Sequence, residues 1–251
     1  NKWTSVEYIR KNLRATEGEP ISEPDLTSDL NWLNGNRFRS IDMFFKPGEE
    51  ALRSDLVVRT SDRLPLGGSV GIDNYGNRFT GQERISAGFE WGKAFGLNEN
   101  SLSYRYLTDV DLEFLRAHIA TYEIRFPWRH KLSLSGSYSE IKGDLPAPLT
   151  QDGTSIQGNL RYEIELPRWG AYRHSFSLGG DFRRLDNNLE FNAINLSADT
   201  TEIAQGVLSY SGLFPDKWGS TFWGGEYYYS PGEITDLNSD SRFVGSYPFT
   251  D

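Results

Sequence analysis

The stretch Ser69-Val-Gly-Ile-Asp-Asn-Tyr-Gly-Asn-Arg-Phe-Thr-Gly81 divides this chain into two unlike parts. It contains the end of one strand, at Val70 and Ile72, then a loop rich in Asn and Gly, then the approach to the next strand. Asn and Gly adopt left-handed backbone angles at little cost, so the chain can reverse direction here. The sequence after this stretch repeats the pattern of strand, polar loop and returning strand. The sequence before it indicates a small unit of helices and strands.

Beyond residue 65 the apolar residues recur with a period of two, which is typical of strands with two unlike faces. In the segment 131–139, Leu132, Leu134 and Tyr138 point one way and four serines point the other. The same alternation recurs in residues 118–126, 156–166 and 175–183. We count about nine strands, each near the roughly 9–11 residues that cross a bilayer at a tilt.

The predicted connections alternate between long and short. The long ones are residues 73–83, 108–116, 140–154, 184–201 and 230–241, and the short ones are 96–100, 127–130, 167–171 and 215–219. The short side also gathers large rings, at Trp91, Phe95, Phe126, Trp128, Trp169, Tyr172, Phe214 and Trp218. Outer-membrane barrels have long extracellular loops, short periplasmic turns and aromatic residues at the membrane interface. The sequence therefore predicts a mainly β fold, part of a transmembrane antiparallel β-barrel, with a soluble β-domain that binds carbohydrate or protein as an alternative.

Residues 1–64 are predicted to form a small α+β domain on the short-turn side, and residues 65–251 the barrel part. Thr4-Ser-Val-Glu7 has the form of a capping box, and Val6, Ile9 and Leu13 then share one helical face. A second helix is predicted from its start signal Ser22-Glu-Pro-Asp25, its apolar stripe Leu26, Leu30 and Leu33, and its C-terminal cap Gly35. Two strands follow, one at residues 38–45 and one at residues 56–59.

The composition excludes several classes of function. The chain of 251 residues has a net charge of −9 and no basic cluster, so a nucleic-acid partner is not expected. It contains 0 Cys, which excludes disulfides and thiolate metal sites. Its mean hydropathy is −0.56 and it has no apolar run long enough for a transmembrane helix. In a membrane barrel the apolar residues alternate with polar ones along each strand, so the mean hydropathy is low. The observed value is therefore compatible with a barrel.

An ordered set of short motifs runs along nearly the whole chain. It comprises Leu33-Asn-Gly-Asn-Arg-Phe-Arg39, Pro47-Gly48, Ser54-Asp-Leu56, Asp62-Arg63, Gly71-Ile-Asp-Asn-Tyr-Gly76, Thr80-Gly81, Phe95-Gly96-Leu97-Asn98 and Asp186-Asn-Asn-Leu-Glu-Phe191. In this order the motifs resemble the haemolysin secretion/activation proteins, which are outer-membrane transporters of two-partner secretion. The family's Val-Arg-Gly-Tyr type motif, first POTRA domain and plug helix do not occur here. We therefore expect the sequence to be part of a longer protein.

The resemblance implies that residues 1–64 are an incomplete POTRA-like domain in the periplasm of a Gram-negative bacterium. It implies that residues 65–251 are the N-terminal part of a barrel in the outer membrane, in contact with its lipid. The partner would be an unfolded secreted exoprotein of the haemolysin or adhesin type, which the protein recognises in the periplasm and translocates without a cofactor. A passive porin-like channel is the alternative function.

No catalytic constellation is evident, so the chain is not expected to be an enzyme. The three His residues, His118, His130 and His174, lie at strand ends and are interpreted as interfacial rather than as metal ligands. The acidic pair Asp109 and Asp111 lacks the spacing of a calcium loop and is interpreted as solvated loop. No metal site is predicted.

Two sets of residues are candidates for polypeptide binding. A strand with an open edge can accept an extended peptide by β-augmentation, and Asn36, Phe38, Arg39 and Ile41 are the candidates for such an edge. Core packing is the alternative role for these side chains, and Leu26 and Leu30 mark a neighbouring groove. The pore-lining candidates are the inward charges Arg105, Arg125, Arg161, Glu163 and Arg183, for which cross-strand ion pairing is the alternative.

Overall fold

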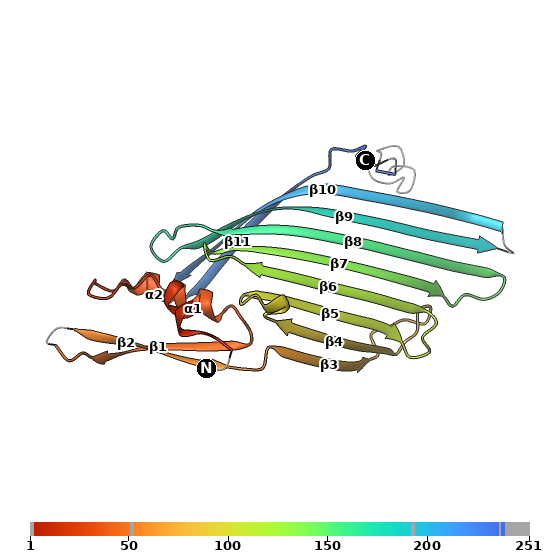
Figure 1. The fold of residues 1–251 in the computed structure, drawn as a ribbon. Helices are drawn as coiled ribbons and strands as arrows, with labels where there is room; N and C mark the ends of the chain where they lie inside the picture. Colours follow the sequence, from red (N-terminus) through yellow and green to blue (C-terminus); the bar gives the residue numbers. More distant parts are fainter. Residues whose placement is uncertain (1–2, 51–52, 192–193, 236, 239–251) are drawn as a thin grey trace.

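The computed structural model describes residues 3–50, 53–191, 194–235 and 237–238, with backbone alone at 195–199. The chain begins with a small unit of four elements, which we call the N-terminal unit. These are α1 (Val6–Lys11), α2 (Glu23–Asn34), β1 (Arg39–Pro47) and β2 (Ser54–Asp62). β1 and β2 form an antiparallel hairpin, and Figure 1 shows the unit at one end of a large sheet.

Helix α1 begins one residue later than the predicted capping box implies. Ser5 is its N-cap residue, and the Ser5 hydroxyl accepts a hydrogen bond from the Tyr8 N–H at 3.2 Å. Thr4 instead donates its hydroxyl to the Asp62 carboxylate at the end of β2, at 2.8 Å. The predicted capping box is therefore wrong, because the charged Asp62 takes the Thr4 hydroxyl away from the helix.

The core of the N-terminal unit is small and consists of Ile9, Leu33 and Ile41, one from each of α1, α2 and β1. Leu13 and Leu30 pack against it, in agreement with the predicted helical faces. Three other residues of the two predicted helices differ from the prediction. Val6 is 63% exposed and lies outside the core, Leu26 is half-buried, and Gly35 is the C-cap residue of α2 but keeps right-handed backbone angles.

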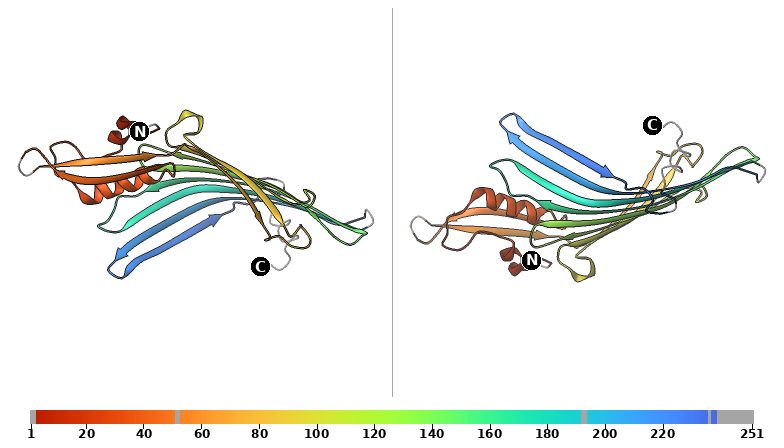
Figure 2. Two further views of the ribbon diagram at one scale, coloured as in Figure 1. Left: turned by 90° about the horizontal axis from the view of Figure 1, so that it is seen from below. Right: turned by 90° about the horizontal axis from the view of Figure 1, so that it is seen from above.

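Among the described residues, the large sheet has nine antiparallel strands, and each strand pairs with its neighbours along the sequence. They are β3 (Leu66–Asp73), β4 (Arg84–Gly92), β5 (Asn100–Asp109), β6 (Leu115–Arg125), β7 (His130–Gly143), β8 (Leu149–Glu165), β9 (Arg173–Phe191), β10 (Ile194–Asp216) and β11 (Gly219–Tyr229). A short 3-10 turn, η1 (Ala94–Gly96), precedes β5. The sheet is open, with β3 and β11 as its two edges, and Figure 2 shows its strong twist.

The register separates the sheet into two unlike faces, because residues paired across antiparallel strands share a face. Ser135, Asn159, Asp181 and Gln205 pair in one row. We call this the serine face. Leu132, Tyr162, Leu178 and Leu208 pair in a row on the opposite side, which we call the leucine face. The predicted alternation and the predicted number of strands are both confirmed.

Strands β7 to β10 are longer than predicted. β7 continues to Gly143, β8 begins at Leu149, β9 continues to Phe191 and β10 begins at Ile194. The predicted long loops at 140–154 and 184–201 are therefore wrong, since most of these residues belong to strands. The predicted loop at 108–116 shrinks to 110–114, and part of the one at 230–241 lies outside the described residues.

The N-terminal unit lies, as predicted, at the end of the sheet that carries the turns at 126–129 and 166–172, which we call the short-turn end. The connections at 110–114 and 144–148 on the opposite end are no longer than the turn at 166–172, so the predicted difference in loop length does not hold for them. The turns at 126–129 and 166–172 both hydrogen-bond to α2, through Arg129 and Arg168. The predicted domain boundary falls in residues 63–65, which connect β2 to β3. In the part of the chain that the structure describes, no helix is both long and apolar enough to cross a membrane.

Candidate functional site

The free edge of β1 is the first candidate site. Arg63 donates its N–H to the Phe38 carbonyl at 2.8 Å, and Gly48 donates its N–H to the Arg53 carbonyl at 3.0 Å. Because hydrogen-bonded pairs alternate in an antiparallel ladder, the even-numbered residues of β1 bond to β2. The odd-numbered residues Ile41, Met43 and Phe45 therefore direct their backbone N–H and C=O groups to the free edge.

Part of this edge is already occupied by a side chain. The Asn34 amide donates to the Ile41 carbonyl at 2.9 Å and accepts the Ile41 N–H at 2.6 Å, as a neighbouring strand would. The Ile41 side chain is 1% exposed and belongs to the core. Ile41 is thus unavailable to an incoming peptide, and the open part of the edge among the described residues is Met43 to Phe45.

Arg39 is buried rather than presented on the edge. Its guanidinium donates twice to the Leu33 carbonyl at the end of α2, at 3.0 and 2.6 Å. It also pairs with Glu99, in the turn before β5, at 2.9 Å, with side-chain exposures of 3% and 8%. Its carbon atom Cζ lies 5.2 Å from the centre of the Tyr8 ring. Burial and the Glu99 charge together raise the pKa of Tyr8, so this phenol stays neutral.

The remaining edge candidates also lie near the sheet. Phe38 packs against β4, since a Cβ added at Gly92 would meet its ring at 2.4 Å. Arg37 forms an ion pair with Glu90 of the same strand. Asn36 closes the turn before β1, where its side chain accepts the Phe38 N–H at 3.0 Å. Sequence reasoning placed these residues in one binding strand, whereas the structure uses most of them to dock the N-terminal unit.

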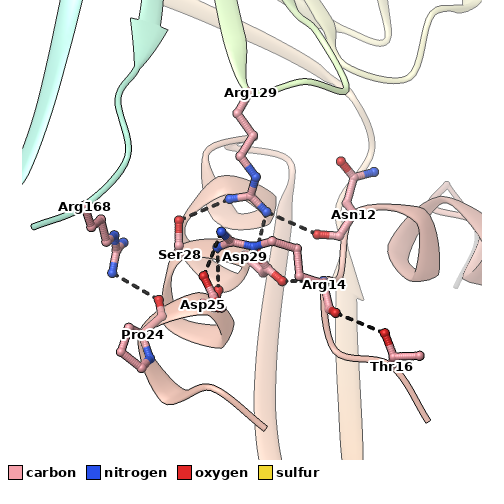
Figure 3. A network of polar contacts seen from close by, with 9 residues as sticks. All are labelled: Asn12, Arg14, Thr16, Pro24, Asp25, Ser28, Asp29, Arg129 and Arg168. Carbon is pink, nitrogen blue, oxygen red and sulfur yellow. Dashed lines mark hydrogen bonds and ion pairs between the residues drawn. The ribbon is translucent and has the colours of Figure 1, made fainter. Parts of the chain in front are cut away.

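Figure 3 shows the polar network at the centre of this junction. Asp29 of α2 is 0% exposed and accepts hydrogen bonds from the Arg14 backbone N–H and guanidinium, at 2.7 and 2.8 Å. Arg129, in the turn between β6 and β7, forms an ion pair with the same carboxylate and donates to the Ser28 hydroxyl at 3.2 Å. Arg168, in the next short turn, donates to the Pro24 carbonyl at 3.1 Å. Nothing in the sequence pattern indicated these contacts.

Arg125 belongs to the junction as well. Its guanidinium lies 4.2 Å from the centre of the Trp32 ring of α2. A Cβ added at Gly35 would meet it at 2.0 Å, so it rests directly on the glycine at the end of the helix. Arg125 lies on the serine face, in the row of Lys131 and Glu163, but its guanidinium contacts α2, so its pore-lining role stays a prediction.

The other four pore-lining candidates share the serine face. Arg161 pairs with Asp181 at 2.6 Å, and Glu163 pairs with Lys131 at 2.8 Å, so these charges are largely balanced across strands. Arg105 and Arg183 are exposed. A hollow of about 560 Å³ on this face is lined by Glu163, Ser175, Ser177, Ser209, Ser211 and Glu226, among others. The face is hydrophilic throughout, but a pore-lining role for these residues stays a prediction.

The leucine face carries rings at the short-turn end. Phe126 stacks on Trp128 with ring centres 4.7 Å apart, and His130 hydrogen-bonds to the Tyr162 hydroxyl at 2.6 Å. His174 is 7% exposed and contacts the Tyr210 hydroxyl at 2.8 Å. His118 lies near the opposite end of the sheet, three residues after the start of β6, and contacts the Tyr104 hydroxyl at 2.7 Å. Each His is thus joined to a Tyr in an aromatic cluster on this face, and its interfacial role stays a prediction.

Asp109 was interpreted as solvated loop, and this is wrong. Its side chain is 1% exposed, and its carboxylate accepts the backbone N–H groups of Glu113, Phe114 and Leu115 at 3.2, 3.0 and 2.8 Å. It therefore organises the loop between β5 and β6. The described ranges contain no group of three or more His, Cys, Asp or Glu placed to hold a metal.

The comparisons with known proteins agree with this architecture. The family model described as haemolysin secretion/activation protein ShlB/FhaC/HecB matches residues 53–222, which is more than half of the chain. This chain belongs to that family. Its members are outer-membrane β-barrel proteins of Gram-negative bacteria that act in two-partner secretion. A comparison with curated protein sequences finds no match.

Two solved structures with a similar fold are both CdiB proteins. CdiB from Escherichia coli has a TM-score of 0.75 at 16% identity, covering 94% of this chain and 44% of that one. CdiB from Acinetobacter baumannii has a TM-score of 0.65 at 19% identity, covering 90% of this chain and 43% of that one. The family member described here therefore spans less than half the length of either structure. At these identities the likeness concerns the fold.

Proposed function

We propose that the full-length protein is an outer-membrane transporter that accepts an unfolded secreted exoprotein and passes it across the membrane through a closed barrel. The observation that carries this proposal is the separation of the two faces of the sheet. The serine face offers hydroxyls and balanced charges, and the leucine face offers apolar side chains and interfacial rings. A barrel closed with the serine face inside has a hydrated lumen and a lipid-facing exterior.

The leucine face fits outer-membrane lipid as its partner. It borders a mainly apolar hollow of about 730 Å³, lined by Leu134, Leu160 and Phe182 together with Pro231 and Ile234 from the segment after β11. The register places Gly158 between these side chains and leaves room there for hydrocarbon. The rings at the end beside the N-terminal unit match the position of an interfacial aromatic girdle.

The N-terminal unit is the proposed receiving module, a POTRA-like domain in the periplasm. Its junction contacts with the turns of the sheet hold it at the periplasmic mouth of the proposed barrel. The open edge at Met43 and Phe45 offers outward backbone groups to an extended chain. Such a module gives a polypeptide transporter a place to collect its cargo, whereas a passive porin has no need of one. The comparisons give no support to the porin alternative.

Deletion of the gene for the full-length protein tests the function. We expect one large secreted protein, or very few, to disappear from the culture medium and to return when the gene is restored. Comparative mass spectrometry of the medium measures this and identifies the exoprotein. An unchanged set of secreted proteins, combined with slower uptake of small solutes, would refute the transporter and support the porin.

A further inference from the structure

A second hollow on the leucine face lies at the short-turn end and is walled by aromatic rings. Its volume is about 580 Å³, and it is lined by Trp169, Tyr172, Tyr210, Phe214 and Trp223. The first two rings belong to the turn between β8 and β9, and the other three to the hairpin of β10 and β11. Figure 2 shows that this hairpin turns at the same end of the sheet as the N-terminal unit. We call these five residues the ring hollow.

The strand register brings the rings together. His174, Gly212 and Trp223 pair in one row across β9, β10 and β11. The Trp223 ring is nearly parallel to that of Tyr172, with ring centres 6.4 Å apart, and its centre is 5.0 Å from that of the Tyr210 ring. A Cβ added at Gly212 would meet the Tyr172 hydroxyl oxygen at 2.0 Å. The Tyr172 ring therefore lies across Gly212, in a position that a larger residue would deny it.

The hydroxyls of the ring hollow are used within the cluster. The Pro167 carbonyl can only accept, so Nε2 of His174, at 2.8 Å, is the donor of that hydrogen bond. In a neutral imidazole the other nitrogen, Nδ1, is then an acceptor, and the Tyr210 hydroxyl donates to it at 2.8 Å. The Tyr172 hydroxyl donates in turn to the Tyr210 oxygen at 3.2 Å. What the hollow offers to a ligand is mainly the faces of its rings.

The charges around the ring hollow favour a cation over an anion. Asp216 lies two residues past Phe214 on the same face of β10, is exposed, and accepts two backbone N–H groups of its own turn. The cationic groups of the two neighbouring turns are engaged elsewhere. Arg168 donates to a carbonyl of α2, and the Lys217 ammonium lies 5.3 Å from the centre of the Trp218 ring.

Aromatic faces are electronegative and attract a cation that lies within about 6 Å of the ring centre. Cages of several rings bind ammonium groups in this way. An acyl chain is the alternative occupant, but the hollow beside Leu134 and Leu160 shows that this face contains a separate site lined largely by aliphatic groups. Trp223 is four residues from Gly219, which closes the hairpin, and thus within about 14 Å of the end of the sheet. That is nearer to the lipid headgroups than to the bilayer midplane.

We propose that the ring hollow binds the ammonium group of phosphatidylethanolamine from the inner leaflet of the outer membrane. This inference rests on the proposed function, which places the leucine face in lipid and the N-terminal unit in the periplasm. The rings surround the ammonium group and Asp216 adds a negative charge at the rim. The acyl chains of the same lipid continue along the leucine face towards the midplane. The bound lipid then borders the turn whose Arg168 contacts α2.

Native mass spectrometry of the full-length protein in detergent tests the inference. The probes are phosphatidylethanolamine and phosphatidylglycerol with the same acyl chains, offered in equal amounts. Phosphatidylglycerol has the phosphate but no ammonium group, so we expect a several-fold preference for phosphatidylethanolamine. Equal binding of the two lipids would assign the hollow to acyl chains, and a preference for phosphatidylglycerol would contradict the charge argument. Either result would overturn the inference.

Matched variants locate the preference at the ring hollow. Trp223→Leu removes one ring but keeps an apolar side chain, so a site for acyl chains would survive it, whereas we expect a several-fold loss of the preference. Trp218→Leu is the control, because Trp218 is exposed and lies outside the hollow. Gly212→Ala keeps every ring but displaces Tyr172, and should weaken the preference as well. Gly206→Ala should not, since a Cβ there meets its nearest neighbour, a backbone oxygen, at 3.8 Å.

Circular dichroism checks that each variant is folded. An unchanged lipid preference in folded Trp223→Leu and Gly212→Ala proteins would overturn the inference. The readout is independent of secretion, so the two proposals can fail separately. A protein without lipid preference whose gene deletion still removes an exoprotein from the medium would leave the transporter intact. A preference that depends on Trp223, with an unchanged set of secreted proteins, would support the lipid site and refute the transporter.

Discussion

Asp29 in α2 and Arg129 in the turn between β6 and β7 form an ion pair that joins the N-terminal unit to the large sheet. The Asp29 side chain is fully buried and is also held by Arg14, which follows α1. One carboxylate therefore fixes three segments of the chain at a single point, as Figure 3 shows. Arg129 and Arg168, in two turns of the sheet, both bind α2 in this way. We therefore infer that charged contacts help to orient the N-terminal unit at the mouth of the proposed barrel.

Replacement of Asp29 should release the N-terminal unit. Removal of one partner from a buried ion pair leaves its partners without a counter-charge and costs about 3–5 kcal/mol. We therefore expect Asp29→Ala in the full-length protein to make residues 63–65 cleavable by protease at a lower urea concentration. Asp25→Ala is the control, because Asp25 also pairs with Arg14, at 2.8 Å, but both side chains are about half exposed. That variant should change stability by less than about 1 kcal/mol. Equal effects of the two substitutions would contradict this account of the junction.

Asp62 gives the N-terminal unit an acid-sensitive contact. Its carboxylate accepts the backbone N–H groups of Trp3 and Thr4 at 3.1 and 2.9 Å, and the Thr4 hydroxyl at 2.8 Å. Burial alone raises the pKa of Asp62, but these hydrogen bonds outweigh it and hold the pKa below its usual value. The contribution to stability is therefore fully present above the unfolded pKa of about 3.9 and is lost as the pH falls through the folded pKa.

Hydrogen–deuterium exchange measures this acid sensitivity. We expect protection of the backbone of α1 to fall as the pH drops below about 4, after correction for intrinsic exchange rates. Asp62→Asn keeps the shape of the side chain but cannot titrate. In that variant the protection of the α1 backbone should be lower at neutral pH and should show no further fall below about pH 4. A step of unchanged size in Asp62→Asn would assign the acid sensitivity to another group.

Leu134 and Ser135 are neighbours in β7 that point to opposite faces, and they test the assignment of lipid and lumen. Leu134 pairs with Leu160 on the leucine face, and Ser135 pairs with Asn159 on the serine face. In the full-length protein, Leu134→Arg should destabilise the barrel by about 2–4 kcal/mol if the site lies near the midplane. Ser135→Arg should be tolerated, because it projects into water. Urea unfolding in lipid vesicles measures both, and similar losses would mean that the faces do not separate lipid from water.

The sequence alone predicted the strands and their faces well, because alternation such as that of Leu132 and Ser133 is a local signal. It predicted the side of the sheet on which the N-terminal unit lies from the positions of the short turns. The full length of β7 to β10 was missed, because polar residues such as Asp186, Asn188 and Glu190 have the composition of a loop. On the other face Leu185, Leu189 and Phe191 continue the alternation with one polar residue, Asn187, between them, and this was the signal that strand pairing persisted there.

The binding and pore candidates were harder to predict, because long-range contacts decide them. Arg39 was placed on an open edge, but its partner Glu99 lies 60 residues further along the chain. Arg125 alternates with apolar residues in β6 as a lumen residue would, and the sequence did not indicate that its guanidinium contacts the Trp32 ring of α2. Both arginines lie at the ends of their strands, Arg39 at the start of β1 and Arg125 at the end of β6, where the N-terminal unit meets the large sheet. Tertiary packing at the junction overrides the pattern at these positions.

The open edge of β1 gives a test of cargo capture that avoids the buried Arg39. Phe45 is 53% exposed, and its backbone N–H points to the free edge, away from β2. Proline at position 45 therefore removes one outward donor and leaves the ladder to β2 complete. Proline at position 44 removes a donor that bonds to Val57, so Phe44→Pro should unfold the hairpin and serves as the disruptive control. Phe45→Ala keeps the N–H and removes only the ring.

An unfolded polypeptide offers backbone groups everywhere but few lasting surfaces, so a sheet edge suits it as a receptor. If the edge is used, Phe45→Pro in the full-length protein should lose most of its affinity for a labelled unfolded segment of the exoprotein. Phe45→Ala should keep most of that affinity, since ladder hydrogen bonds carry it. Fluorescence anisotropy measures the binding, and circular dichroism checks that each variant is folded. Undiminished binding by a folded Phe45→Pro protein would exclude this edge. The outward groups of Leu56 and Val58 on β2 would then be the next ones to test.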